Sequence, residues 1–269
     1  MSQSSHAANR RPPRFALALH LSLVVATLIA CGSTPAGTTG TASRPGGRGV
    51  LFVGNSLTYV NDVPGLVQAL ADSVGVHLDV RTVAFPDFAL EDHWASGGAV
   101  REIERGDWEL VVMQQGPSST DANRANLRDW SKRFGGVIAA RGARPALYSV
   151  WPSAARQADF TRAIESYSLA AADVRGDFYP VASAWLAAWR RAPALALYAG
   201  DALHASPIGS YLAALVIAAE ITGRPTTDFP TRVSTATGAT LDVGAVVGAL
   251  LKEAASEALR GAAPALGPA

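Results

Sequence analysis

Short apolar runs alternate with longer amphipathic segments along the chain from residue 50 onward. The short runs have the length and composition of buried strands, and the longer segments carry apolar residues at helical spacing. The predicted strands cover residues 50–53, 78–84, 110–113, 146–150 and 178–181. The predicted helices between them cover residues 63–74, 90–103, 122–140 and 160–174. The alternation predicts one α/β domain in which a mostly parallel five-stranded sheet carries helices on both faces.

A last amphipathic segment, residues 243–259, predicts a helix that packs on the edge of this domain. Hydrophobic residues make up 49% and charged residues 17% of the 269-residue chain, which provides enough apolar material for a sizeable core. The formal charge is +1, and no block of Lys and Arg occurs. A nucleic-acid partner is therefore not expected.

The first thirty residues consist of a basic segment followed by an apolar one. Three arginines lie within residues 10–14, and residues 15–30 form an apolar run without charge. This order is typical of an export signal, and the run is short for a membrane span. It ends in the tetrapeptide LIAC at residues 28–31, which resembles the lipobox of bacterial lipoproteins. An ordinary secretory signal or an uncleaved anchor is the alternative, but Cys31 is the only cysteine of the chain, which favours the lipobox.

The resemblance to a lipobox implies that residues 1–30 are a lipoprotein signal peptide and that Cys31 is lipidated. The mature protein is then expected to be extracytoplasmic and held at the bacterial cell envelope by its lipid anchor. Removing three arginines and no acid changes the formal charge from +1 to −2. Residues 31–48 are rich in Ser, Thr, Gly and Pro and predict a flexible tether, so the folded domain is expected over residues 49–262.

The first predicted strand runs directly into Gly54-Asn55-Ser56. The first long helix is expected to start later, with Asn61 or Asp62 as its N-cap and a proline in its first turn. Functional residues of an open parallel sheet gather at the carboxyl ends of its strands, where Gln114-Gln115 and Trp151-Pro152 also lie. A serine beside Gly and Asn also occurs in turns with a purely structural role, so this motif alone does not identify a nucleophile.

Asp201 and His204 are separated by one turn and directly precede an apolar helical segment. A serine hydroxyl is a poor nucleophile at neutral pH and requires a base, and the base requires a group that orients it. At this spacing a carboxylate can accept a hydrogen bond from one imidazole nitrogen while the other nitrogen faces a nucleophile. A turn-capping aspartate beside a surface histidine is the alternative, because Asp-x-x-His by itself is a weak signal.

Together, Gly54-Asn55-Ser56 and Asp201-x-x-His204 resemble the motifs of the SGNH, or GDSL-type, hydrolases in their order along the chain. The resemblance covers residues 50–222 and implies a three-layer, flavodoxin-like α/β fold. It also implies a serine esterase with a Ser-His-Asp triad, in which Ser56 is the nucleophile, His204 the general base and Asp201 the residue that orients His204. Neither a metal nor an organic cofactor is required for this chemistry.

The oxyanion hole is the point at which this sequence departs from the family pattern. Members usually supply the serine amide, a Gly amide after the second strand and an Asn side chain after the third. Here neither that Gly nor that Asn directly follows the corresponding predicted strand. We therefore expect donors from the amide of Ser56, the amide of Asp87 or Phe88, and the side chain of Gln114, or of Gln115 in its place. Both glutamines also fit a structural role as strand-terminal residues that bond loop backbone.

The expected substrate-binding residues share the same edge of the sheet. They are Asn55, Tyr59, Gln115 and Trp151, with Asn61 as a further candidate. The envelope anchor and the loop aromatic residues favour O-acetyl or O-acyl groups on carbohydrate among the carboxylic esters. A non-catalytic lipoprotein that binds a glycan or acyl group is one alternative. A glycan acyltransferase that uses the same residues is another.

Histidines of the mature chain are scattered and predict no metal site. His93 is expected on a predicted helix as a surface or partly packed residue. No glycine-rich phosphate-binding motif follows the first predicted strand, which argues against a dinucleotide or nucleotide cofactor.

Overall fold

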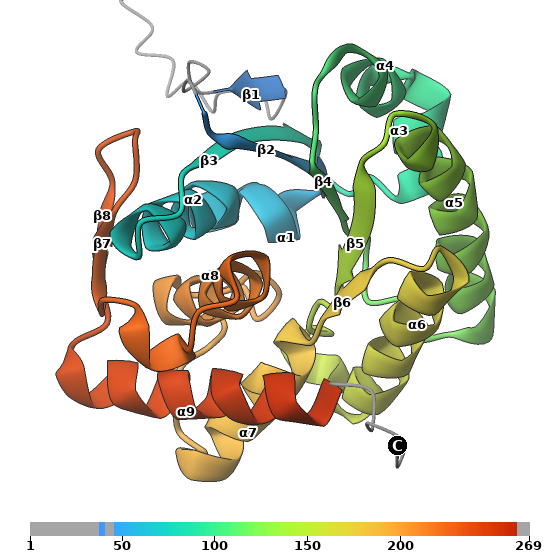
Figure 1. Ribbon diagram of the computed structural model, residues 1–269. Coiled ribbons are helices and arrows are strands. Elements are labelled where there is room, and N and C mark those ends of the chain that lie inside the picture. Colours follow the sequence, from blue (N-terminus) through green and yellow to red (C-terminus); the bar gives the residue numbers. More distant parts are fainter. Residues whose placement is uncertain (1–37, 41–45, 263–269) are drawn as a thin grey trace, which may run out of the picture. The chain divides into compact units, whose positions relative to one another are not determined.

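The computed structural model describes residues 38–40 and 46–262, and a sheet with the strand order β1-β3-β2-β4-β5-β6 lies at its centre (Figure 1). The strands are β1 (Thr38–Gly40), β2 (Arg48–Gly54), β3 (Leu78–Ala84), β4 (Leu110–Met113), β5 (Arg144–Tyr148) and β6 (Asp177–Tyr179). The five strands from β3 to β6 in this order are parallel, which confirms the predicted fold class. When these five strands are numbered 1 to 5 by their order in the chain, they lie side by side in the order 2-1-3-4-5. This is the flavodoxin-like arrangement.

Strand β1 pairs antiparallel with β3, and it belongs to the segment that the sequence analysis interprets as a tether. The other residues of that segment up to residue 45 lie outside the described residues. The predicted signal peptide and Cys31 lie outside them as well. Within the described ranges, no helix has both the length and the apolar character that crossing a membrane requires.

Helices cover both faces of the sheet, with α2 and α8 on one face and α5 and α6 on the other (Figure 1). The helices of the described chain are α1 (Ser56–Tyr59), α2 (Val63–Ser73), α3 (Leu90–Ser96), α4 (Gly98–Arg105), α5 (Asp121–Ala140), α6 (Phe160–Asp173), α7 (Val181–Arg191), α8 (Pro207–Thr222) and α9 (Ala245–Ala262). Three short 3-10 helices, η1 (Val60–Asp62), η2 (Ala154–Asp159) and η3 (Thr226–Asp228), and a hairpin of β7 (Arg232–Ser234) and β8 (Thr240–Asp242) complete it.

Most predicted boundaries agree with the structure, and two differences have clear causes. The predicted helix over residues 90–103 is two helices, because Gly97 adopts a left-handed conformation (φ 68°) that ends α3 and begins α4. The last predicted strand ends two residues early, at Tyr179, because α7 begins at Val181. Asp62 caps α2 by accepting a hydrogen bond from the Gly65 amide, as one of the two predicted alternatives.

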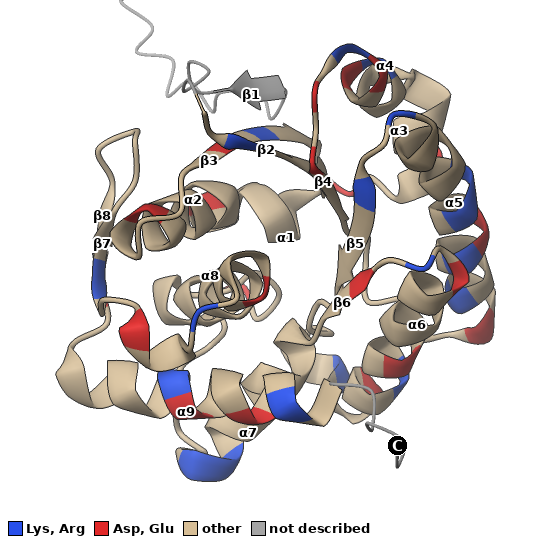
Figure 2. Cartoon of the chain, in the orientation of Figure 1, with Lys and Arg blue, Asp and Glu red and all other residues tan. Residues whose placement is uncertain are grey.

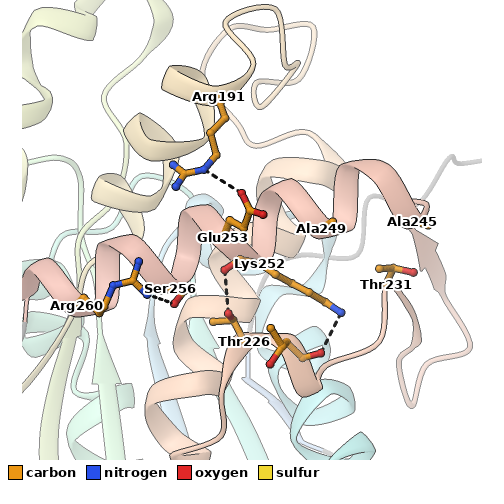
Figure 3. A pocket seen from close by; sticks show the side chains of 10 residues that line it. Arg191, Thr226, Thr231, Ala245, Ala249, Lys252, Glu253, Ser256 and Arg260 are labelled. Carbon is orange, nitrogen blue, oxygen red and sulfur yellow. Dashed lines mark hydrogen bonds and ion pairs between the residues drawn. The ribbon is translucent and has the colours of Figure 1, made fainter.

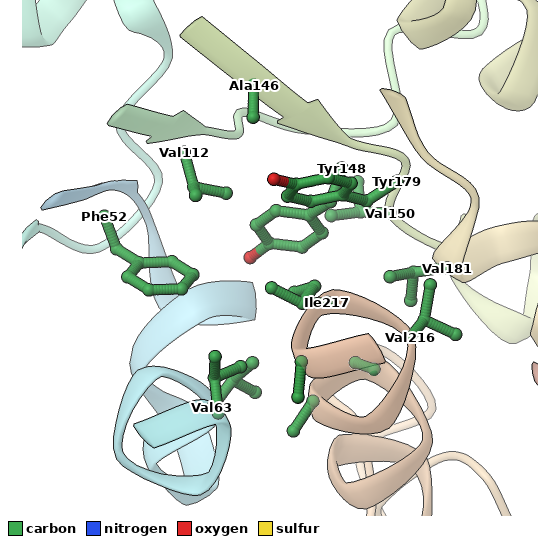
Figure 4. Close-up of a cluster of buried hydrophobic side chains, with 14 of the residues drawn as sticks. Phe52, Val63, Val112, Ala146, Tyr148, Val150, Tyr179, Val181, Val216 and Ile217 are labelled. Atoms are coloured by element: carbon green, nitrogen blue, oxygen red, sulfur yellow. The ribbon is translucent and has the colours of Figure 1, made fainter. Parts of the chain in front are cut away.

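One apolar layer lies between the sheet and the pair α2 and α8 (Figure 4). Phe52, Val112 and Tyr148 of three neighbouring strands point into this layer, and Ile217 of α8 and Val63 of α2 meet them from the other side. All five side chains are at most 1% exposed. Because burial of such side chains stabilises the fold by about 1.5–3 kcal/mol each, this layer fixes α8 against β2, β4 and β5.

Helix α8 is apolar around its whole circumference. Twelve of its sixteen residues are buried, because α2, α7 and α9 surround it. Figure 2 shows charged residues on the outer helices α5, α6 and α9, whereas α8 carries one acid, Glu220. Such a helix is a buried helix. The loop that enters it, which contains Asp201 and His204, is therefore attached to a rigid part of the protein.

Candidate active site

The serine of Gly54-Asn55-Ser56 begins a single helical turn at the carboxyl end of β2. Asn55 caps this turn, since its Oδ1 accepts a hydrogen bond from the Leu57 amide at 3.1 Å. Ser56 is the first residue of α1 and is partly exposed. Among the described residues, neither its hydroxyl nor its amide has a hydrogen-bond partner. The segment that begins at Ser56, which precedes the predicted start of the first long helix, is thus an ordered turn that presents a free hydroxyl and a free N–H group.

Gly54 is required by close packing. A Cβ atom at this position would lie 2.1 Å from Thr58 Oγ1 and 2.5 Å from Gln114 Oε1. Both oxygens are buried and hydrogen-bonded to each other at 2.8 Å, so they cannot move away at low cost. The glycine therefore allows the turn that begins at Ser56, the predicted nucleophile, to fold back onto the end of β4; residues 55–59 are called the nucleophile turn below.

Asp201 and His204 form a directly hydrogen-bonded pair. Nδ1 of His204 donates to Asp201 Oδ2 at 2.6 Å, and the other carboxylate oxygen accepts from the amides of Leu203 and His204 at 3.0 and 2.9 Å. The side-chain hydrogen bond from His204, followed by these backbone bonds, lowers the pKa of Asp201 to about 2. The carboxylate is consequently ionised at neutral pH and fixes the Nδ1–H tautomer of the imidazole.

The second imidazole nitrogen of His204 is unoccupied. Nε2 is shielded from solvent and has no hydrogen-bond partner among the described residues. In the neutral tautomer with the proton on Nδ1, Nε2 carries a lone pair. The Ser56 hydroxyl does not bond to it in this structure, and hydrogen bonds between a nucleophile and its base are often long until the substrate binds.

Gln114 does not have the geometry of an oxyanion donor, in contrast to the prediction. It is fully buried, and its Nε2 donates to Asn55 Oδ1 at 2.9 Å and to the carbonyl oxygen of Gln115. Its Oε1 accepts from the Asn55 amide at 3.0 Å and from the Thr58 hydroxyl at 2.8 Å. Both amide hydrogens are used, so Gln114 has the structural role that was the alternative.

Gln115 is committed to the protein in the same way. Its Oε1 accepts from the Leu90 amide at 3.0 Å, and its Nε2 donates to Ser118 Oγ at 3.0 Å and Asn126 Oδ1 at 3.3 Å. Its backbone N–H and C=O are both bonded by the Tyr167 hydroxyl. The predicted roles of Gln115 as an oxyanion donor or a substrate contact are therefore wrong for this geometry.

Two further expected substrate contacts are buried and have other partners. Asn55 is 6% exposed and bonds Phe88 O through Nδ2 at 3.0 Å, in addition to its bonds within the nucleophile turn. Trp151 is fully buried, stacks on Trp185 at 4.2 Å between ring centroids, and donates its indole N–H to Leu203 O at 2.9 Å. Through this hydrogen bond, Trp151 supports the loop that contains Asp201 and His204. Only Tyr59 of the four expected residues is half-exposed with no side-chain hydrogen bond among the described residues.

The turn after β3 supplies a second free amide. Phe88 N donates to Phe85 O at 3.4 Å, whereas the Asp87 amide has no acceptor among the described residues. Asp87 has φ 58°, a left-handed conformation that glycine adopts most readily. The chain therefore builds a glycine-type turn without glycine, and of the two predicted amides that of Asp87 is the available one.

His93 is a site residue whose position the sequence did not reveal. It was expected as a surface or partly packed residue of a helix, but it is fully buried, and its Nε2 donates to Gly54 O at 2.7 Å. Burial lowers its pKa, partly offset by the bond to Gly54, so the ring is neutral and Nδ1 is left without a partner. Phe85 and Phe88 pack against the ring at 6.0 and 5.1 Å between centroids. His93 therefore joins the turn of Asp87 to the strand end that carries Ser56.

A cavity of about 660 Å³ lies away from these residues, between η3 and α9 (Figure 3). Within it Arg191 pairs with Glu253 at 3.5 Å, and Lys252 donates to Thr227 O at 3.3 Å. It contains none of the predicted site residues. Within the part of the chain that the structure describes, no group of three or more His, Cys, Asp or Glu side chains could hold a metal ion.

The strand order and the placement of Ser56, Asp201 and His204 define a flavodoxin-like α/β protein with a serine at its first parallel strand. A protein from Slackia heliotrinireducens, described as an SGNH hydrolase, is 30% identical, with 65% of this chain and 99% of that chain covered at a TM-score of 0.55. The chain belongs to the SGNH hydrolases, because this likeness spans nearly the whole relative.

Two more distant solved structures share the fold. A DUF4886 family protein from Bacteroides uniformis is 17% identical, with 79% of this chain and 95% of that one covered at a TM-score of 0.66. The lipase/acylhydrolase from Enterococcus faecalis is also 17% identical, with 66% and 96% covered at a TM-score of 0.54. No protein-family model and no curated protein matches the sequence.

Proposed function

We propose that this protein is a serine esterase that hydrolyses carboxylic esters with Ser56 as nucleophile, His204 as base and Asp201 as the residue that orients the base. The observation that carries the proposal is the Asp201–His204 pair. Its 2.6 Å hydrogen bond occupies Nδ1, and Nε2 stays buried with a free lone pair. A histidine held in this way is prepared to accept a proton from a hydroxyl.

Acylation begins when Nε2 of His204 removes the proton of the Ser56 hydroxyl. The oxygen of Ser56 then attacks the ester carbonyl carbon, and the carbonyl oxygen becomes an oxyanion. The bond to the alcohol breaks as His204 returns the proton to the leaving oxygen. In deacylation His204 takes a proton from water, and the water oxygen attacks the acyl carbon. The bond between the acyl carbon and the Ser56 oxygen then breaks as His204 returns the proton to Ser56, and the acid is released.

The developing oxyanion is stabilised by main-chain donors in this proposal. The amides of Ser56 and Asp87 are the two candidates, because neither is hydrogen-bonded within the described chain. One such donor typically contributes about a hundredfold to a thousandfold in rate. The side-chain donor usual in the family is missing, since Gln114 uses both amide hydrogens internally.

The proposed substrate is an O-acetyl or O-acyl group on carbohydrate, and the proposed location is the outer side of a bacterial membrane, with a lipid on Cys31. The basic and apolar segments before the LIAC tetrapeptide support the location. The substrate choice is supported by that location and by Tyr59, whose half-exposed ring lies one turn after Ser56. A formal net charge close to zero and the lack of a Lys and Arg block are consistent with an uncharged ester.

A second candidate is a non-catalytic lipoprotein that binds a glycan or an acyl group. It is favoured by one observation, the burial of Gln114 and Gln115 in place of a side-chain oxyanion donor. A fluorophosphonate probe, which reacts only with activated serines, separates the two candidates. If the protein is an esterase, Ser56 reacts with the probe and the protein cleaves p-nitrophenyl acetate.

The test uses the full chain and three variants. Ser56→Ala and His204→Ala are expected to abolish labelling and turnover. Ser153→Ala is the matched control, because Ser153 lies after β5 at the same edge of the sheet and its hydroxyl caps no helix. Absence of both labelling and ester cleavage in the unmodified protein would refute the esterase proposal and leave the binding protein.

A further inference from the structure

The loop that carries the base is held through four consecutive carbonyl groups. The carbonyls of Ala202 and Leu203 accept from Ala154 N and Trp151 Nε1, both at 2.9 Å. The carbonyl of His204 accepts from Ala199 N at 2.8 Å. The last of the four, Ala205 O, accepts from Asn61 Nδ2 at 2.9 Å.

The Asn61 bond differs from the other three in its origin. Trp151 and Ala154 follow β5, and Ala199 belongs to the same loop as the base. Asn61 belongs to η1, five residues after Ser56. Among the described residues, it provides the hydrogen bond that joins the nucleophile segment to the residue next to His204.

Both hydrogens of the Asn61 amide are used, and its orientation is unambiguous. Nδ2 donates to Ala205 O at 2.9 Å and to Ser210 Oγ, in the first turn of α8, at 3.0 Å. A carbonyl oxygen only accepts hydrogen bonds, so the atom that faces Ala205 must be the nitrogen. Although Asn61 is exposed overall, its amide therefore has no donor left for a substrate.

The backbone at Asn61 is shaped to make this contact. Asn61 and Asp62 both have positive φ, 58° and 54°, in consecutive residues. Left-handed conformations are rare outside glycine, and Asn and Asp tolerate them best. The two residues turn the chain from α1 into α2, and the Asp62 carboxylate holds the turn by capping Gly65. Unfavourable backbone conformations that persist in this way cluster at functional sites.

We infer that Asn61 is a positioning residue that sets the distance between Ser56 and Nε2 of His204. The inference rests on the proposed esterase function. The nucleophile turn is otherwise anchored through Asn55 and Thr58, which bond to the ends of β4 and β5 and to the turn after β3. The base loop is anchored by Trp151 and Ala154, which follow β5. The Asn61 bond couples these two sets of anchors, and a displacement of about 1 Å between reacting groups can cost about a hundredfold in rate.

Two substitutions of Asn61 and one control test the inference in the full chain. Asn61→Gly keeps access to the left-handed backbone and removes the amide. Asn61→Asp keeps the side-chain shape and replaces the donor by an acceptor that faces Ala205 O. Ser210→Ala is the control, because it removes the second partner of Asn61 and leaves the bond to Ala205 intact. The measurements are the fluorophosphonate labelling rate, kcat and KM for p-nitrophenyl acetate, and the thermal unfolding midpoint.

Both Asn61 variants are expected to lower kcat and the labelling rate by about tenfold to a hundredfold, with KM within about twofold. Ser210→Ala is expected to stay within about twofold of the unmodified protein in both rates. The inference is overturned if Asn61→Gly reacts at the unmodified rate, if only KM rises, which would make Asn61 a substrate contact, or if Ser210→Ala slows the reaction equally. Failure of the unmodified protein to label overturns the proposed function itself, and the inference with it.

Discussion

Gln114 and Asn55 satisfy each other through two hydrogen bonds. Nε2 of Gln114 donates to Asn55 Oδ1 at 2.9 Å, and Oε1 of Gln114 accepts from the Asn55 backbone amide at 3.0 Å. The residue after β4 thus fixes the residue that caps the nucleophile turn. The side chain that the sequence predicted as an oxyanion donor is thus part of the support beneath the turn that begins at Ser56.

Replacing Gln114 by Leu is expected to affect stability first. It leaves the Asn55 amide and the Asn55 side-chain oxygen with fewer partners in a buried position, which should lower the free energy of unfolding by about 1–3 kcal/mol. Urea unfolding measures this change, with Gln157→Leu on the exposed surface of η2 as the control. Unchanged stability together with a hundredfold lower kcat would restore the role of oxyanion donor to Gln114.

Substitution of Asp87 by Gly is expected to preserve kcat within a few fold, because the proposed donor at this position is the backbone N–H. Gly relieves the positive φ of Asp87 and adds flexibility to the unfolded chain, and these two effects on stability oppose each other. Asp87→Pro removes the N–H group and also cannot adopt the positive φ of this turn, so it should lower kcat by about a hundredfold or more. If the Pro variant is folded and has the same kcat as the unmodified protein, the Asp87 amide is not the second oxyanion donor.

Because His93 is buried, the free energy of unfolding is expected to decrease below about pH 6.5, the ordinary pKa of histidine. Burial lowers the pKa of the folded-state ring, so the unfolded chain binds more protons than the folded chain between this lowered pKa and about 6.5. The stability contributed by the neutral ring is complete above that window and decreases as the pH falls through it. Urea unfolding at several pH values measures the slope.

His93→Gln is the informative variant for this prediction. It keeps an N–H donor near Gly54 O and cannot titrate, so the slope between about pH 6.5 and 5 should become flatter. The same variant should retain most of the fluorophosphonate labelling at pH 7.5, whereas His93→Phe, which removes the donor, should not. A slope that is identical in both variants and the unmodified protein would contradict the prediction.

The variant Trp151→Phe distinguishes two roles of Trp151: support of the loop that carries His204, and contact with a sugar substrate. The stack on Trp185 is largely retained, and the hydrogen bond to Leu203 O is lost, which should cost about 0.5–1.5 kcal/mol of stability. Because the indole is fully buried, KM for ester substrates should remain unchanged while kcat decreases. An increase in KM alone, measured with an acetylated sugar, would indicate contact with the substrate.

The sequence predicted the strands well for a physical reason. Buried parallel strands are continuous apolar runs, and two of them, β3 and β4, begin and end at the predicted residues. The contact between Asp201 and His204 could also be predicted from the sequence, because the two residues lie within one turn of each other.

The roles of the glutamines and of His93 could not be predicted in this way. The partners of Gln114 are Asn55 and Thr58, which lie 59 and 56 positions away in the chain, and the partner of His93 lies 39 positions away. Which way these side chains point depends on the packing of three loops against one another. The turn at Asp87 was likewise hidden, since its glycine-like conformation carries no glycine in the sequence.

The buried position of α8 has a consequence for the order in which this protein is made. Synthesis delivers β2 and Ser56 early, whereas His204 and α8 emerge near the end of the domain. A nascent chain that stops before Asp201 lacks the proposed base, and it also lacks α8, which covers the apolar layer in Figure 4 together with α2. Such contacts between distant segments close late in folding. If the proposed function holds, the nascent chain is expected to be inactive toward esters, with its apolar layer incompletely covered, until residues 201–222 have been synthesised.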